Sequence, residues 1–202
     1  MATLQSTGLA TFGRPADAQY VSIARLSDNP TVPTSVSATL GNQYKSAGLV
    51  TEDGITQSLD LGKDDPLKDW NLKSIISPEA NPTSTLEIRL MSQTADALGI
   101  VYGGANVTGA DNSGVSYSFD GPTDGFVVVI DELWNAADGT PTRAHRLVYP
   151  SVSLKEIGDI DHTKSGAIIY DCTFEALVDE SGKYFYGYIA AAAPAQSGNT
   201  EG

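Results

Sequence analysis

The sequence predicts a mainly β protein: a β-sandwich or barrel-like domain with one short flanking α-helix, a long loop and extended termini. Alternation is clearest in residues 85–91, where Leu86, Ile88 and Leu90 fall on one face of a strand and polar residues on the other. Residues 167–178 repeat this pattern over a longer span. A period of two is typical of a half-buried strand.

Other segments fit the same class. Residues 126–130 (FVVVI) are apolar on both faces, which predicts a central strand that is covered on both sides. Further strands are expected at residues 20–26, 45–50, 70–76, 115–120, 126–133, 143–155 and 184–190.

One helix is expected between residues 92 and 103. Ser92 or Thr94 can cap its first turn, apolar residues recur at helical spacing as far as Tyr102, and Gly103-Gly104 ends it. A helix this short is not stable alone in water. It must therefore pack against the sheets.

The chain length favours one domain with extended arms. We expect a β domain over residues 18–190, an N-terminal arm over 1–17 and a flexible C-terminal tail over 191–202. Residues 51–69 are rich in acids and contain Gly54, Gly62 and Pro66, so a long acidic loop is expected there.

The charge balance excludes whole classes of partner. Twelve Lys and Arg stand against 25 Asp and Glu, which gives a net charge of −13 without any basic cluster. Tight binding to DNA or to an anionic membrane needs clustered cations, so neither is expected. A simpler interpretation is that the acids only keep the protein soluble.

We expect neither membrane insertion nor secretion, and no catalytic or metal chemistry. No apolar run approaches the roughly 20 residues of a membrane span, no secretory signal is recognised, and the single Cys172 cannot form an intrachain disulfide. Folding in a cytoplasm is expected.

His145 and His162 have no partners at metal-ligand spacing, and no nucleophile elbow or phosphate loop is found. We expect no catalytic, metal or cofactor site and no enzymatic activity.

An ordered set of motifs carries a family resemblance. Residues 48–54 (GLVTEDG) lead through an acidic segment to Trp70, and residues 85–90 (TLEIRL) run into a helix that ends IVYG at 100–103. This order resembles the major tail tube proteins of bacteriophages with long, non-contractile tails. The similarity extends over roughly residues 44–190 and includes RLVYP at 146–150.

The resemblance implies a structural subunit that assembles with itself. Such proteins form six-membered rings that stack into a hollow tail tube, together with a tape-measure protein and tail-tip or terminator proteins. The location implied is the virion, after assembly in the host cytoplasm. Six copies of this chain would carry −78, so we expect a like-charged conduit through which DNA is ejected without tight binding.

Several residues are candidates for these roles. Candidate lumen-facing acids are Asp171 and Glu175, with Glu87 a weaker one; all three have plain solvated side chains as the alternative. The acidic loop is a candidate for contact between rings, through Glu52, Asp53, Asp60, Asp64 and Asp65. Trp70 and Trp134 are candidate interface anchors, although a core aromatic is the commoner case.

Other functions remain open at this level. A tube protein of a contractile tail or a tail-end cap would share much of the pattern. A carbohydrate-binding or adhesive β-sandwich would also be strand-rich and acidic, but it should expose a row of aromatic side chains. A hydrolase would need a cleft in which titratable groups converge.

Overall fold

The computed structural model describes residues 12–15, 20–62, 67–68, 70–71, 74–76, 81–121, 124–135 and 141–191. The strands among them are β1 (Phe12–Pro15), β2 (Val21–Arg25), β3 (Lys45–Ser46), β4 (Val50–Asp60), β5 (Leu67–Lys68), β6 (Ser74–Ile76), β7 (Thr83–Leu90), β8 (Val107–Ala110), β9 (Gly114–Tyr117), β10 (Gly125–Asn135), β11 (Pro141–Ile157), β12 (Tyr170–Ala176) and β13 (Tyr186–Ala191). The helices are α1 (Ala95–Val101) and the single 3-10 turns η2 (Leu26–Asp28) and η3 (Gly104–Asn106).

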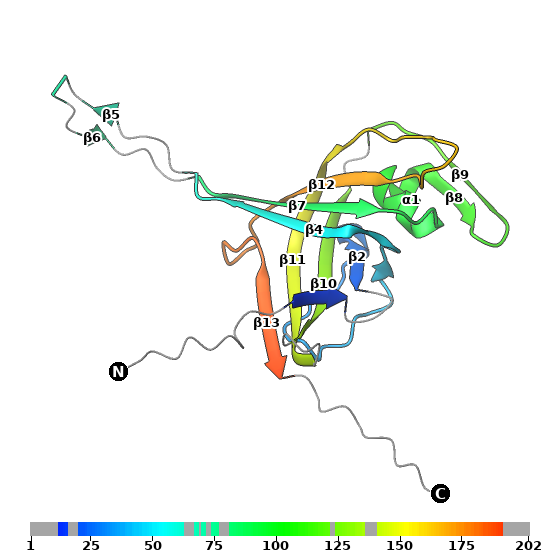
Figure 1. Cartoon of the computed structure of the whole chain (residues 1–202), viewed down its shortest axis with the longest axis horizontal. Coiled ribbons are helices and arrows are strands. Elements are labelled where there is room, and N and C mark those ends of the chain that lie inside the picture. The colour runs from blue at the N-terminus through cyan, green and yellow to red at the C-terminus, as the bar shows by residue number, and fades with distance from the viewer. Residues whose placement is uncertain are drawn as a thin grey trace, which may run out of the picture.

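The main sheet wraps around on itself. Its strand order is β3-β2-β10-β11-β12-β7-β4, and β3 and β4 are consecutive in the chain. Residues 47–49 therefore cross from one edge of the sheet to the other. The Ala47 N–H donates to the Val21 carbonyl at 2.9 Å and the Met91 N–H donates to the Leu49 carbonyl at 2.8 Å. The structure confirms a mainly β, sandwich-like or barrel-like fold (Figure 1).

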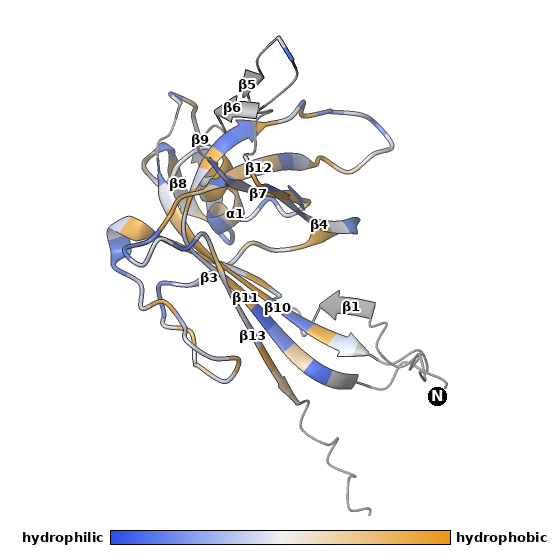
Figure 2. Ribbon diagram, turned by 90° about the vertical axis from the view of Figure 1, so that its left-hand side faces the viewer, coloured by the Kyte–Doolittle hydropathy of each residue, from blue (hydrophilic) through white to orange (hydrophobic). Residues whose placement is uncertain are grey.

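The core lies inside this curved sheet. Leu86, Ile88 and Leu90 are buried, and Cys172 and Phe174 on the neighbouring β12 are buried with them. The period-two pattern of both segments is confirmed. Figure 2 shows hydrophilic and hydrophobic bands toward the outer ends of β10 and β11.

Strand β10 is covered on both faces, as the sequence predicts. Phe126 and Val128 belong to the main core, whereas Val127 and Val129 form an outer cluster with Val148. Partly buried side chains from the segment that follows β2, and Tyr188 of β13, cover the outer cluster. This strand is therefore the centre of the molecule.

The predicted helix is confirmed as α1. The Thr94 hydroxyl accepts from the Ala97 N–H at 3.2 Å, which caps the first turn, and Asp96 lies in that turn. Leu98 and Val101 are buried against the sheet core. Gly103 then adopts φ 90° after the end of the helix, a conformation that costs glycine little. Helix α1 packs at one end of the sheet (Figure 1).

The predicted loop over residues 51–69 is wrong for residues 51–60, which belong to β4. Thr56, Ser58 and Asp60 alternate with Ile55, Gln57 and Leu59, but the acidic composition obscures this period. A bulge between Val50 and Ile55, with Gly54 at φ 78°, also breaks the alternation. Strands β4 and β7 form a hairpin that extends beyond the body, with β5 and β6 near its tip (Figure 1).

Other boundaries differ from the prediction. Strand β12 is shorter than the 167–178 expected, and the longest strand is β11, with 17 residues. Phe12–Pro15, assigned to the arm by sequence, pairs with β10. The rest of the predicted arm and residues 192–202 of the predicted tail lie outside the described residues.

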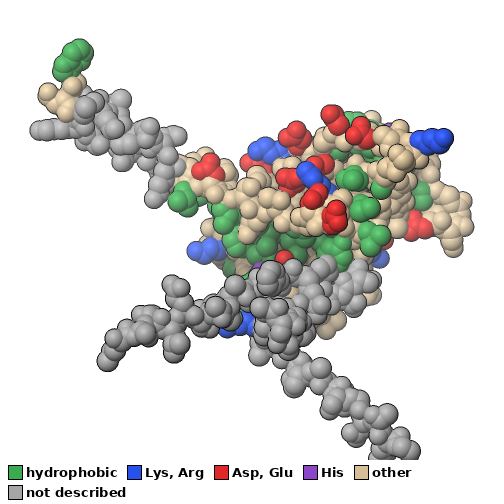
Figure 3. Space-filling view, viewed as in Figure 1, with side chains coloured by type: hydrophobic (Ala, Val, Ile, Leu, Met, Phe, Trp, Pro, Cys, Tyr) green, Lys and Arg blue, Asp and Glu red, His purple; other side chains and the backbone are tan. Residues whose placement is uncertain are grey.

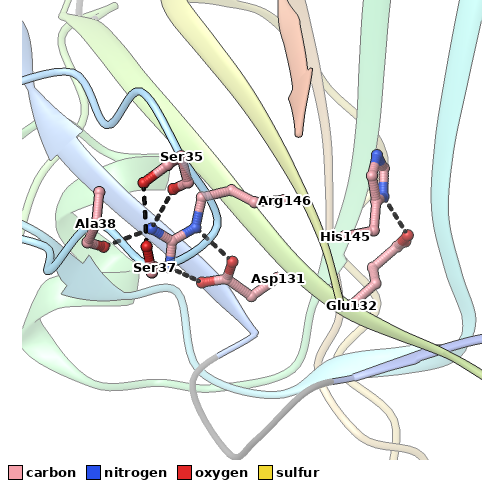
Figure 4. A network of polar contacts seen from close by, with 7 residues as sticks. All are labelled: Ser35, Ser37, Ala38, Asp131, Glu132, His145 and Arg146. Atoms are coloured by element: carbon pink, nitrogen blue, oxygen red, sulfur yellow. Dashed lines mark hydrogen bonds and ion pairs between the residues drawn. The ribbon is translucent and has the colours of Figure 1, made fainter. Parts of the chain in front are cut away.

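A buried ion pair holds the segment after β2 against the outer face of the sheet. The Arg146 guanidinium donates to both carboxylate oxygens of Asp131, at 2.6 and 2.9 Å. It also donates to the Ser35 carbonyl at 3.2 Å and to the Ala38 carbonyl at 2.6 Å (Figure 4). Since the Arg146 side chain is only 9% exposed, this planar group replaces water for three partners at once.

Candidate functional site

The register of β7 and β12 brings the three candidate lumen acids onto one face. Asp171 lies opposite Arg89, and Glu175 lies opposite Thr85, with Glu87 between them opposite Thr173. Residues that face each other in an antiparallel pair point to the same side of the sheet. The other side of these strands is the core. The three acids therefore share the solvent side of this sheet.

Arg89 is the centre of this surface. Its guanidinium lies 3.0 Å from Asp171, 3.0 Å from Asp53 and 3.3 Å from Glu87. The negative charge of Asp171 is the main cause that raises the pKa of the Arg89 guanidinium. The hydrogen bond that Arg89 donates to Asp171 is the second cause. One cation thus joins β7, β12 and the bulge of β4.

We call the acidic face the surface formed by Asp53, Glu87, Glu156, Asp171 and Glu175 with the cations Arg89 and Lys155. Lys155 lies 3.6 Å from Glu175. Five carboxylates against two cations leave a formal charge of −3. Figure 3 shows Asp and Glu side chains gathered on this side of the body. Such a surface repels a polyanion at close range.

The predicted inter-ring acids do not form one cluster. Glu52 and Asp53 lie in the bulge of β4, on the body of the molecule. Asp60 lies at the far end of β4, where its carboxylate accepts from the Gly62 N–H at 2.9 Å. Asp64 and Asp65 lie outside the described residues. The hairpin has acids at both its base and its far end.

The two tryptophans have different environments. Trp70 lies in the turn between β5 and β6 and is 100% exposed, so the core interpretation is wrong for this residue. Trp134 is partly buried on β10, where its indole N–H donates to Glu132 at 3.1 Å. Its ring lies 4.5 Å from that of His145. The hairpin thus presents a large apolar side chain to solvent.

One comparison with known proteins bears on identity. A family model described as "Phage tail tube protein" matches residues 14–199. The chain belongs to the phage tail tube protein family. No curated protein matches it. The tail tube protein is therefore a structural component of the virion that assembles into a tube, which confirms the resemblance to phage tail tube proteins.

Two reactive side chains of this tail tube protein, His145 and Cys172, lie among other protein groups. His145 lies 3.0 Å from Glu132 (Figure 4), and its ring lies 4.5 Å from that of Trp134. Burial raises the pKa of the Cys172 thiol to about 12, so it is not a nucleophile near neutral pH. Within the described ranges there is no group of His, Cys, Asp or Glu suited to a metal ion. No helix in the same ranges is long and apolar enough to cross a bilayer.

Sequence reasoning missed Arg89 because its role depends on strands that are distant in the chain. Asp53 and Asp171 are 36 and 82 residues away from it in sequence. The one local signal is the alternation Glu87-Ile88-Arg89, which places a cation beside an acid on the polar side of a strand. The partners on β4 and β12 follow only from the register of the tail tube protein's sheet.

Proposed function

We propose that this tail tube protein forms six-membered rings that stack into the tube of a long, non-contractile tail, with the acidic face lining the bore. DNA passes through this bore on ejection, and a tape-measure protein occupies it before. Tail-tip and terminator proteins close its two ends. The single observation that carries the proposal is the gathering of Glu87, Asp171 and Glu175 on one face of one sheet, in a member of this family.

The charge on that face suits a passage for DNA. Six copies of a surface at −3 carry −18, much less than the −78 of six whole chains, because most of the acids lie elsewhere. Counterion release, the main source of non-specific DNA affinity, needs protein cations. Salt screens the repulsion beyond about 8–10 Å. The wall therefore acts only on DNA that comes close, which prevents trapping.

Free sheet edges support a ring of copies side by side. Among the described residues, β4 pairs only with β7 and β13 pairs only with β11. Each of these strands has a second edge whose N–H and C=O groups are open to another chain. A closed ring removes such edges, as a barrel does.

The projecting hairpin supports contact between rings. It carries Leu59 and Leu61, both exposed, and ends near the exposed Trp70. A large apolar side chain that extends away from the body is suited to binding a partner. In a stacked tube this partner is a copy in the next ring.

Electron microscopy tests the assembly directly. Concentrated protein should form tubes whose end views have six-fold symmetry. Another symmetry would overturn the ring number, and a protein that never assembles, even with tail-tip proteins added, would overturn the tube itself.

Thiol labelling tests which face lines the bore. In tubes of Glu175→Cys, a small maleimide should react with position 175, whereas a maleimide on a bulky polymer should not. Both reagents should react with the isolated subunit, and the buried Cys172 should react with neither. Equal reaction of the bulky reagent in tubes would place the acidic face outside. Loss of both reactions in tubes would place it in an interface.

A further inference from the structure

Exposed large apolar side chains gather at two opposite ends of strand β7. Its first residue, Thr83, follows the projecting hairpin, and its last, Leu90, leads into α1. Figure 1 shows the hairpin and the α1–β8–β9 unit at opposite ends of the molecule. Near the hairpin, the exposed apolar residues are Leu59, Leu61, Trp70, Leu177 and Val178. Near α1, they are Leu26, Leu49, Tyr117 and Phe119.

The end near α1 contains a built aromatic surface. The rings of Tyr102 and Tyr117 stack with centroids 4.7 Å apart, and the ring of Phe119 meets Tyr102 edge-on at 6.4 Å. Tyr170 packs against Tyr102 from the core side, at 6.1 Å. Phe119 nevertheless remains 65% exposed. Packing on the core side therefore holds this surface in place, while its outer side is open to solvent. Such a surface can bind another aromatic side chain.

The charges around α1 are compatible with binding of the hairpin tip to the aromatic surface. Exposed acids surround α1, among them Asp28, Asp96, Asp111 and Asp120. In a chain of net charge −13, residues 63–73 contain three lysines and three aspartates and are therefore neutral. A neutral tip segment can approach the acidic end of a second copy without net repulsion.

We infer that the tip of the hairpin, with Trp70, binds the aromatic surface of Tyr117 and Phe119 on a second copy of the chain. The inference rests on the proposed stacking and names the two surfaces that meet. Because the surfaces lie at opposite ends of β7, the contact is head-to-tail, and a pair of copies still has one free tip and one free aromatic surface. Repetition of such a contact extends an open array.

Cross-linking tests the contact. We would mix Asn71→Cys protein with Ser118→Cys protein, which keep Trp70, Tyr117 and Phe119, one of them carrying a size tag, and treat the mixture with a short bis-maleimide. Thr39→Cys replaces Ser118→Cys in the control, since Thr39 is also exposed but lies in the segment after β2, which belongs to neither proposed surface. Cys172 is buried and should not react. The 71–118 product should exceed the 71–39 product at least tenfold.

The outcomes separate this inference from the proposed function. Equal yields of the two products, or a dominant 71–71 product, would overturn the head-to-tail contact even if tubes form. A strong 71–118 product without rings would overturn the six-membered ring and leave the contact standing. If neither tubes nor the cross-linked product form, both the proposed function and this inference are overturned.

A loss-of-contact variant provides a second readout. Replacing both Tyr117 and Phe119 by serine should shorten the tubes, because each copy loses its receptor, while Thr39→Ala, at an exposed position outside the proposed surfaces, should leave tube length unchanged. Mixing this variant with Trp70→Ala protein should restore short complexes that do not extend, since one intact pair of surfaces remains. Tubes of normal length from the double serine variant would contradict the inference.

Discussion

Removal of the Arg146 guanidinium should destabilise the protein by about 3 kcal/mol. In Arg146→Met, Asp131 remains as a carboxylate without its cation, and the carbonyls of Ser35 and Ala38 lose their donor. Breaking a buried ion pair from one side costs about 3–5 kcal/mol. Since the Asp131 side chain is 22% exposed, water recovers part of this energy and the lower end of the range applies.

The matched control removes both charges. In the double variant Arg146→Met, Asp131→Leu no charge is left unpaired, although the two carbonyls still lack a donor. We expect a loss of about 1–2 kcal/mol, less than that of the single variant, because burial of an unpaired ion is the larger penalty.

Urea unfolding measures both losses. Fluorescence of the partly buried Trp134 should report the transition, and the slope of unfolding free energy against urea should stay constant while the midpoint falls. In a domain of this length a loss of about 3 kcal/mol lowers Tm by about 6–12 °C. A single variant that loses less than about 1 kcal/mol, or a double variant as unstable as the single one, would refute this account of Arg146.

Three further predictions concern the Cys172 thiol, the glycine at position 62 and the cap of α1. The Cys172 thiol, whose pKa burial raises to about 12, should react with iodoacetamide at pH 8 only after denaturation; reaction in the folded protein would contradict its burial. Gly62→Ala should disrupt the hairpin and tube formation, because φ is 58° and the new Cβ would clash with the Asn81 carbonyl. Gly114→Ala is also strained by its positive φ but meets no other atom, so tubes in microscopy should be disturbed less than by Gly62→Ala. Thr94→Ala removes the cap of α1 and should cost about 1 kcal/mol in urea unfolding; an unchanged midpoint would argue against the cap.

The sequence predicts those parts of the fold that local chemistry determines. Residues 85–91 read as a strand because burial of one face imposes a period of two, and α1 follows from the cap at Thr94 and the glycine at 103. Strand β4 escapes this reasoning because its pairing with β7 tolerates acids on the solvent side. The exposure of Trp70 also could not be predicted, since an aromatic residue is usually buried in its own chain.

The candidate site divides in the same way. The alternation along β12 predicts that Asp171 and Glu175 share a face, and the structure agrees. That Glu87 joins them, and that Arg89 binds acids from three strands, depends on sheet register. The hydrophobic pattern restricts register, but it does not say that β7 pairs with β12 and β4, which are distant in the chain.

The separation of charged and apolar surfaces is itself an argument for the orientation of the subunit. Burying the acidic face between copies would remove water from the network around Arg89, which desolvation makes unfavourable. Burying Trp70 or Phe119 instead removes exposed aromatic surface from water, which is favourable by roughly 25 cal/mol per Å². Copies should therefore meet through the two ends of β7 and leave the acidic face in contact with solvent. A tube built in this way keeps its carboxylates hydrated and joins its copies through aromatic side chains, as the proposed function requires.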